Sequence, residues 1–367
     1  MNRKIEKVLV AMSGGVDSSA AAALIRREQI PAVGCTMRLW EGAQQEDSAC
    51  CSLDDTEDAR AVAFRLGMPY YVFNYREAFA EKVIEPFVCG YLRDETPNPC
   101  IECNRHLKFG ALMTRAAELG CTHVATGHYA RIEERDGEYF LKKALDPPKD
   151  HSYVLWSLTQ EQLAHTLFPL GAMRKEEIRL LAEREGFRNA HKPESQDICF
   201  VPDGNYAAVI EAVSGRKAEP GAFVDRDGKV LGTHRGITHY TVGQRRGLGI
   251  AAERPLYVCR IDPEKNEVVL GPPEALFSRT VAVRGAQMVS GRMPEEPFRC
   301  RAKLRYRQPE QPALAVPEAA DRLTLIFDEP QHAPAPGQAA VLYEGDTVLG
   351  GGTIDGSGIA AGPDRED

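Results

Sequence analysis

The sequence predicts an α/β amino-terminal domain with a parallel sheet, followed by a small central domain and a carboxyl-terminal β-barrel domain. Its 367 residues exceed what one hydrophobic core usually serves. The first ~200 residues alternate strand-like and helix-like patterns, as in βαβ units. Beyond about residue 205, short β-rich runs between Gly and Pro turns favour small barrels or sandwiches. We therefore expect domains at residues 1–205, 206–275 and 276–367.

The individual elements follow from hydrophobic periodicity. KVLVAM (7–12) is a continuous apolar run typical of a buried strand, and after a Gly turn an Ala-rich helix is predicted from about Val16 to Glu28. Further strands are predicted at 31–39, 69–75 and 123–129, and an amphipathic helix at 175–185. The runs TVAVRGAQMV, RAKLRYR and LTLIFD predict strands of the carboxyl-terminal domain.

The amino-acid composition limits the classes of protein to which the chain can belong. No stretch approaches the ~18 apolar residues of a membrane span, and the first residues lack the apolar core of a signal peptide, so we expect a cytoplasmic protein without a membrane partner. Thiols stay reduced there, so ten cysteines indicate metal binding or catalysis rather than a disulfide framework. The net charge of -8 argues against a globally basic nucleic-acid binder but permits a local basic surface.

The stretch AMSGGVDSSAA lies where a predicted strand ends and a helix begins, at the sheet edge where open α/β folds bind ligands. Backbone N–H groups of Ser13, Gly14 and Gly15 can surround an anionic phosphate, aided by the helix dipole. The spacing is neither a Walker A loop nor a dinucleotide fingerprint. It resembles the S-G-G-x-D-S PP-loop of ATP pyrophosphatases, which implies that Asp17 helps to hold Mg²⁺ and that Ser18 contacts the pyrophosphate.

The two cysteines of NPCIECN (98–104) are compatible with several chemical roles. We expect Cys100 and Cys103 on a loop and a helix start, where the helix N-terminus favours the thiolate. A lone C-x-x-C without a second pair is a weak zinc signal. Cys199, in the polar segment ESQDICF, is a third candidate, although an isolated cysteine is more often a small buried hydrophobe.

In FRCRAKLRYRQ, cationic residues occupy every second position from 299 to 307. On a strand this alternation places five cations on one face and the apolar residues on the other. Such a face favours a polyanion such as a tRNA backbone. The alternative is a solvated face whose cations have carboxylate neighbours.

The PP-loop, NPCIECN, ATGHYAR, KDHSYVL, ESQDICF and TVGQRRGLGI occur in one order. Together they resemble the tRNA-specific 2-thiouridylases of the MnmA family, from about Lys7 to Gly352. The resemblance implies an adenine nucleotide alpha-hydrolase-like fold and ATP-dependent 2-thiolation of the wobble uridine at position 34. In that chemistry the C2 carbonyl oxygen is adenylated and then replaced by sulfur, giving 2-thiouridine, AMP and pyrophosphate.

The resemblance also implies how sulfur is handled. Cys199 would carry a persulfide delivered by a cysteine desulfurase or a sulfur-relay protein, and Cys103 would act with it through a transient disulfide. Two positions depart from the family pattern: Cys100 replaces the usual aspartate of N-P-D-x-x-C, and His151 replaces the usual glutamine. With Cys100 present, three thiols could instead hold an oxygen-sensitive [4Fe–4S] cluster with one open iron site.

The family motifs imply two further sets of residues. The ATP-binding set comprises Ala11, Met12, Ser13, Gly14, Gly15, Val16, Asp17, Ser18, Met37 and Gly127. The tRNA-binding set comprises Asn98, Pro99, Cys100, His128, Lys149, Asp150, His151, Arg305, Tyr306 and Gln338. The expected partners are wobble-uridine tRNAs of the Lys, Glu and Gln types. The alternative function is a PP-loop synthetase or amidotransferase acting on a small molecule, which would need no cysteine set.

Overall fold

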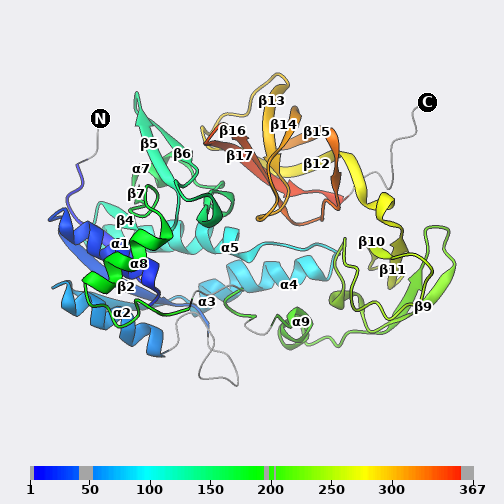
Figure 1. Ribbon diagram of the computed structural model, residues 1–367, viewed down its shortest axis with the longest axis horizontal. Helices are drawn as coiled ribbons and strands as arrows, with labels where there is room; N and C mark the ends of the chain where they lie inside the picture. Colours follow the sequence, from blue (N-terminus) through cyan, green and yellow to red (C-terminus); the bar gives the residue numbers. More distant parts are fainter. Residues whose placement is uncertain (1–3, 41–52, 194–197, 202–203, 357–367) are drawn as a thin grey trace.

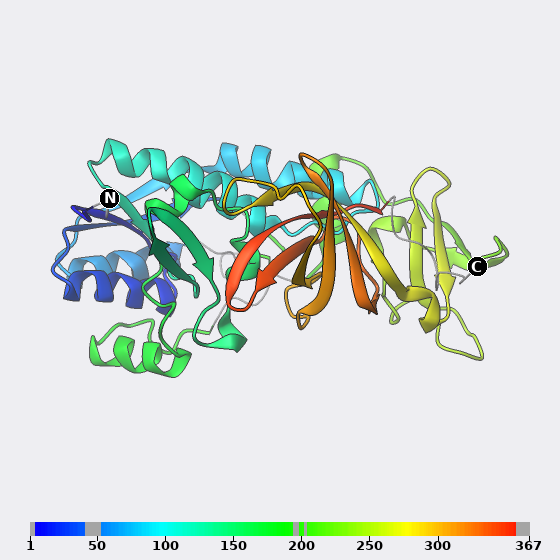
Figure 2. The same ribbon diagram turned by 90° about the horizontal axis from the view of Figure 1, so that it is seen from above.

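The computed structural model describes residues 4–40, 53–193, 198–201 and 204–356. The molecule is elongated, with the amino-terminal domain at one end and residues 221–271 at the other (Figures 1 and 2). The barrel lies between them, so the domain that is last in sequence occupies the middle of the molecule. Within the described ranges, no helix is long and apolar enough to cross a membrane.

The amino-terminal domain is built on a parallel sheet whose described strands follow the order β3-β2-β1-β4-β7. These strands are β1 (Val8–Ala11), β2 (Ala32–Arg38), β3 (Tyr70–Asn74), β4 (His123–Ala125) and β7 (Thr166–Leu167). The first four lie inside the predicted segments. Because strands are added in opposite directions on either side of β1 and β4, the carboxyl ends of these two strands border the crevice where such sheets bind ligands.

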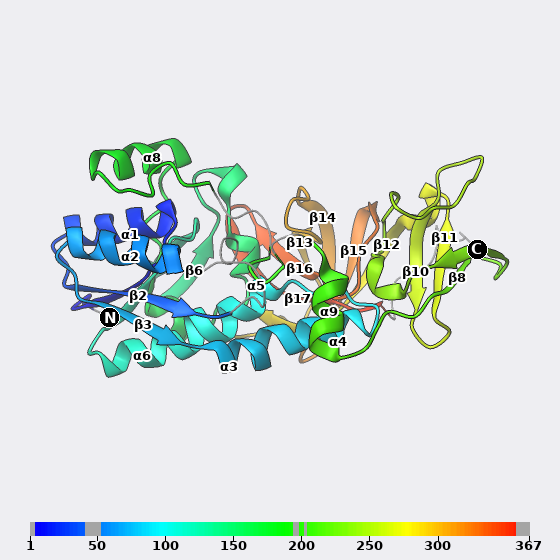
Figure 3. The same cartoon turned by 90° about the horizontal axis from the view of Figure 1, so that it is seen from below.

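Helices cover both faces of this sheet (Figure 3). One face is covered by α1 (Val16–Arg27) and α2 (Leu53–Arg65), with α8 (Lys175–Arg184) packed on α1, and the other face by α6 (Leu112–Glu118). Side chains along β1 point alternately to the two faces of the sheet, which explains this arrangement. Val8 and Val10 pack in the core beneath α1, whereas Leu9 packs in the core on the opposite face. The other helices are α3 (Arg76–Phe79), α4 (Glu85–Tyr91), α5 (Pro99–Glu102), α7 (Gln160–Ala164) and α9 (Tyr206–Ser214), with π-helical segments at Ala80–Ile84 and Cys103–Ala111.

The carboxyl-terminal domain is a closed barrel, as predicted. Its described strands are β12 (Phe277–Met288), β13 (Phe298–Lys303), β14 (Gln311–Ala319), β15 (Arg322–His332), β16 (Ala339–Glu344) and β17 (Thr347–Ile354). They follow the order β12-β15-β14-β13-β16-β17, and pairing of β12 with β17 closes the ring. Inward-facing side chains such as Val281, Ala302 and Leu325 fill its interior.

A hairpin of the amino-terminal domain extends the barrel sheet, which the sequence analysis did not predict. It consists of β5 (Arg131–Arg135) and β6 (Glu138–Lys142), and Lys142 pairs with Thr347 of β17. Asp346 reinforces the junction, because its carboxylate lies 2.8 Å from Arg131 and 3.2 Å from Lys142. The first and last domains therefore share one sheet.

The second domain contains a smaller sheet with the strand order β10-β11-β8-β9 in the described residues. Its strands are β8 (Gly221–Val224), β9 (Val230–His234), β10 (Tyr257–Asp262) and β11 (Glu267–Gly271), around a core that includes Phe223 and Val268. Helix α9 leads into this domain and packs on α4, where the rings of Tyr91 and Tyr206 stack with centroids 6.0 Å apart.

Candidate active site

The loop after β1 has the form expected of a phosphate cradle. Helix α1 begins at Val16, with Asp17 in its first turn. The Ser18 hydroxyl closes the loop, since it accepts a hydrogen bond from the Ser13 N–H at 3.1 Å and donates to the Gly15 carbonyl at 3.0 Å. The residues predicted to bind pyrophosphate are thus held in one tight turn at a helix N-terminus, where backbone N–H groups and the dipole favour an anion.

Helix α2 and the segment around Asn189 hold this loop. Gly14 has φ +77°, and a Cβ there would lie 2.2 Å from the Asp55 carbonyl oxygen of α2. The buried Asn189 amide donates to the Gly14 carbonyl at 2.7 Å and to the Ser19 hydroxyl at 2.9 Å. Only glycine meets both demands at position 14, because the left-handed conformation and the close approach to α2 exclude a side chain.

The structure brings Gly127 to the same place. It follows β4, and a Cβ at this position would lie 2.8 Å from the Ser18 backbone nitrogen. The loops after β1 and β4 therefore meet at the switch point of the sheet. Met12 and Met37, also predicted to surround ATP, have side chains almost fully buried in the cores on opposite faces. Because these two side chains are buried, only the main-chain groups of Met12 and Met37 are available to contact a nucleotide.

Asp17 is surrounded by groups that the sequence did not reveal. Its Oδ1 accepts hydrogen bonds from the Tyr129 hydroxyl at 2.6 Å and from Nζ of Lys175 at 2.7 Å. Lys175 is nearly buried at the start of α8, whereas Asp17 remains about one quarter exposed. No group of three or more acidic, His or Cys side chains in the described residues could form a metal site made by protein alone. Asp17 fits the other way of holding Mg²⁺, in which one carboxylate acts together with substrate phosphates and water.

His151 lies near this carboxylate, and His128 packs against His151. The rings of His128 and His151 meet edge to face with centroids 5.6 Å apart, and the Tyr129 N–H donates to Nδ1 of His151 at 3.3 Å. Burial lowers the pKa of His151 to about 4, with the Asp17 charge opposing the shift. Burial, followed by the Lys108 charge, also lowers the pKa of His128 well below its ordinary value. Both rings are therefore neutral at pH 7 and can exchange hydrogen bonds without adding charge to the phosphate site.

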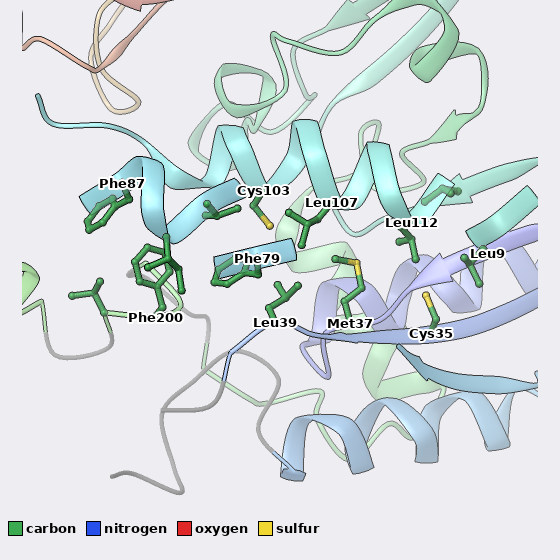
Figure 4. Close-up of a cluster of buried hydrophobic side chains, with 14 of the residues drawn as sticks. Leu9, Cys35, Met37, Leu39, Phe79, Phe87, Cys103, Leu107, Leu112 and Phe200 are labelled. Carbon is green, nitrogen blue, oxygen red and sulfur yellow. The ribbon is translucent and has the colours of Figure 1, made fainter. Parts of the chain in front are cut away.

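The cysteines of the C-x-x-C motif lie in consecutive helical turns. Asn98 caps α5, its side-chain oxygen accepting the Cys100 N–H at 3.1 Å, and Cys100 is exposed. Cys103 begins the following π-helical segment and is buried beside Phe79 and Leu107 (Figure 4). Cys199 packs against the same apolar cluster. Residues 194–197 of the ESQDICF motif lie outside the described residues.

The three thiols do not form one metal-ligand group in the described part of the chain. Cys103 and Cys199 belong to the apolar cluster, while the exposed Cys100 lies near Tyr306, whose pKa is raised to about 12 by burial, then by the Asp150 charge and, to a smaller extent, by that of Cys100. The alternative of a [4Fe–4S] cluster held by all three cysteines stays a prediction. Cys103 and Cys199 thus share one apolar cluster, while Cys100 lies near a residue of the barrel domain.

The expected tRNA-binding residues take different positions. Asp150 is buried, and its carboxylate accepts hydrogen bonds from the Ala144 and Ser152 N–H groups and the Ser152 hydroxyl. These hydrogen bonds give the Asp150 side chain a structural role, and its expected contact with tRNA stays a prediction. Three others lie where the barrel approaches the cysteine motif, and their described contacts are to protein groups. Arg305 donates to the Ala333 carbonyl, Tyr306 packs against Tyr153, and Gln338 donates to the Thr96 carbonyl.

The predicted stripe of five cations is wrong. Strand β13 ends at Lys303, so Arg305 and Arg307 lie in the following turn. The alternation is real within the strand, where Cys300 and Ala302 face the core. However, Arg299 forms a two-pronged ion pair with Asp328, and Arg301 lies near Glu310. The first two cations are thus compensated by carboxylates of the same domain.

Comparisons with known proteins cover nearly the whole chain. Family models match residues 6–203 (tRNA methyl transferase HUP domain), 210–272 (tRNA methyl transferase PRC-barrel domain) and 278–354 (Aminomethyltransferase beta-barrel domain). A protein of Clostridioides difficile named tRNA-specific 2-thiouridylase MnmA is 46% identical over 356 residues, covering 96% of this chain and 99% of that protein. Proteins with the same name from Geotalea uraniireducens and Carboxydothermus hydrogenoformans are each 48% identical, covering 96% and 95% of this chain and 96% and 98% of their own length.

Proposed function

The chain belongs to the family of tRNA-specific 2-thiouridylases named MnmA, and we propose that it replaces the C2 oxygen of a tRNA uridine with sulfur, using ATP. The observation that supports this proposal most strongly is the loop after β1, which has the form of a phosphate-binding loop and lies at the switch point of the sheet, in a chain that aligns with these enzymes over 96% of its length. We assign the reaction to the wobble uridine, position 34, of tRNAs of the Lys, Glu and Gln types. The small-molecule synthetase alternative is not favoured by relatives whose shared name specifies tRNA.

The first half-reaction turns a poor electrophile into a reactive one. The C2 oxygen of uridine attacks the α-phosphorus of ATP, pyrophosphate leaves, and the oxygen becomes part of an AMP ester. Ser13 to Ser18 are assigned to the phosphates, and Asp17 to a Mg²⁺ ion that would neutralise charge on the leaving pyrophosphate. Lys175 and Tyr129 hold the Asp17 carboxylate in place for this role.

The second half-reaction delivers sulfur. We assign the persulfide to Cys199, loaded by a cysteine desulfurase or a relay protein, because its segment packs on the cluster that contains Cys103. The terminal sulfur bonds to C2 and AMP departs. The Cys103 thiolate then attacks the Cys199 sulfur, releasing 2-thiouridine and leaving a disulfide, which an external thiol reduces before the next turnover.

The flipped uridine is assigned to the space next to Asn98, Pro99 and Cys100, since chemistry on a base edge requires that the base leave its stack. A wobble base is already exposed in its loop, which makes this extrusion inexpensive. Other tRNA contacts are assigned to His128, Lys149, His151, Arg305, Tyr306 and Gln338. A reaction on tRNA accords with a cytoplasmic location.

The test is a reconstituted assay with ATP, Mg²⁺, unmodified tRNA, a cysteine desulfurase and cysteine. We expect 2-thiouridine by nucleoside mass spectrometry, together with pyrophosphate release that depends on tRNA. Cys199→Ala should release pyrophosphate but form no 2-thiouridine, whereas Cys300→Ala, a barrel-core thiol, should keep both activities. Pyrophosphate release that ignores tRNA but responds to a small amine would favour the synthetase alternative. Normal thiolation by Cys199→Ala would refute the persulfide assignment.

A further inference from the structure

The connection between α4 and α5 touches all three domains. We call residues 94–97 the junction segment; it ends one residue before Asn98, the cap of the cysteine-bearing helix. In Figure 1 this part of the chain runs beneath the barrel, between the amino-terminal domain and the second domain. Nothing in its sequence, DETP, indicates a contact role.

Glu95 and Thr96 bind the barrel. The Glu95 carboxylate forms an ion pair with Arg284 of β12. The Thr96 N–H donates to the Pro336 carbonyl at 2.7 Å, and its carbonyl accepts from Nε2 of Gln338 at 2.5 Å. These contacts are close, because a Cβ on Gly337 would lie 2.7 Å from the Glu95 Cβ. Both backbone polar groups of Thr96 are thus committed to one loop of the barrel.

The ends of the segment bind the other two domains. Asp94 has φ +65°, and its carboxylate lies near the Ile261 backbone of β10 and near Arg260. Pro97 packs against Gly90 of α4, where a Cβ would lie 2.9 Å from the proline ring. The left-handed Asp94 ends α4, because the Glu95 N–H after it donates back to the Gly90 carbonyl at 3.0 Å.

We propose that the junction segment positions α5, and with it Cys100 and Cys103, according to where the barrel and the second domain sit. Glu95 and Gln338 are the positioning residues: they fix the backbone immediately before the cap, without being required to touch the reacting atoms themselves. A tRNA that docks across the barrel would thereby set the cysteine helix for sulfur transfer. This inference rests on the proposed thiolation activity.

The test compares Glu95→Ala with the charge exchange Glu95→Arg/Arg284→Glu. We expect Glu95→Ala to lower kcat for thiolation about ten- to a hundredfold, since small misplacements of reacting groups carry penalties of that order. The KM for ATP and the Kd for tRNA should stay within about twofold, because Glu95 lies outside the sites assigned to both. The charge exchange should recover part of kcat, since it restores the pair with position 284, while Arg93, which lies 3.5 Å from the Glu95 carboxylate, would then face an arginine. Glu185→Ala, which removes a surface ion pair with Arg27, is the matched control and should behave as wild type.

A readout independent of turnover separates this inference from the proposed function. The alkylation rate of the exposed Cys100, followed by peptide mass spectrometry, should change in Glu95→Ala and in Gln338→Ala but not in Glu185→Ala. If wild type makes no 2-thiouridine, the proposed function fails while the alkylation comparison still tests the positioning. The inference is overturned if Glu95→Ala keeps full kcat and wild-type alkylation, or if equal losses of kcat appear in the variant and the charge exchange.

Discussion

The ion pair beneath the phosphate loop gives a prediction that separates folding from catalysis. Lys175 has a side chain only 9% exposed, and its ammonium faces Oδ1 of Asp17 at 2.7 Å. Asp17→Ala removes the carboxylate and leaves this cation in a buried environment. Breaking a buried pair from one side costs ~3 to 5 kcal/mol, and we expect about 3 kcal/mol here, since Asp17 itself is partly open to solvent.

The double variant Asp17→Ala/Lys175→Met should recover much of that loss, because methionine fills the space of the lysine stem without a charge. Tyr129 still loses the acceptor of its hydroxyl, so ~1 kcal/mol of the deficit should remain. Urea unfolding followed by tryptophan fluorescence reports on this domain, since both tryptophans, Trp40 and Trp156, lie in it.

The exposed pair Glu81 and Lys82 is the control, and Glu81→Ala should change stability by less than ~0.5 kcal/mol. A double variant no more stable than Asp17→Ala would refute the reasoning, because it would mean that water or other groups stabilise the Lys175 ammonium when Asp17 is removed. All variants that lack Asp17 should lose tRNA-dependent pyrophosphate release, whatever their stability.

Three further outcomes are expected. Gly14→Ala should abolish pyrophosphate release, because φ is +77° and the methyl group would meet Asp55, whereas Gly67→Ala, with φ +64° in open space, should cost ~1 kcal/mol and stay active. His151 has its folded pKa depressed to about 4, so its contribution to stability is complete above pH ~6.5 and is lost as pH falls towards 4. His151→Gln should make the urea midpoint less dependent on pH across that window, while His128, whose pKa is also lowered, keeps part of the dependence. A pH dependence equal to that of wild type would contradict the assignment. Arg299→Ala should leave the salt dependence of tRNA binding unchanged, since Asp328 already neutralises the Arg299 charge. Arg307 is exposed, and Arg307→Ala should reduce the slope of log K against log salt by ~0.7 to 0.9, the value for one phosphate contact. Equal slopes for the two variants would show that Arg307 does not contact tRNA.

The sequence revealed those parts of the site that are local in the chain. The phosphate loop needs a strand end, a glycine turn and a helix start in succession, and all three are visible as one short motif. Lys175, Tyr129 and Asn189 complete the same site from distant segments, and a single lysine or asparagine in a helix or loop carries no pattern that points to Asp17 or Gly14. Their roles depend on tertiary packing alone.

The barrel shows where pattern reading goes wrong and where it was incomplete. Alternation from Arg299 to Lys303 was correct, but the end of the strand there depends on the turn that follows, which alternation cannot show. The hairpin that extends the barrel could have been predicted, because Asp136 and Gly137 form a D-G pair between alternating runs, a common two-residue hairpin signal. Its pairing with Thr347 could not, since nothing local specifies a partner so far along the chain.

That shared sheet also bears on how the chain is made. The strand ending at Lys142 leaves the ribosome about 200 residues before its neighbour at Thr347, a delay of roughly 10 to 40 s at ordinary rates of translation. Throughout that interval the outer edge of the strand has no native neighbour and is a template for unwanted pairing. The lysines and glutamates that line the hairpin would then act as gatekeepers during synthesis, keeping nascent chains from adhering to one another.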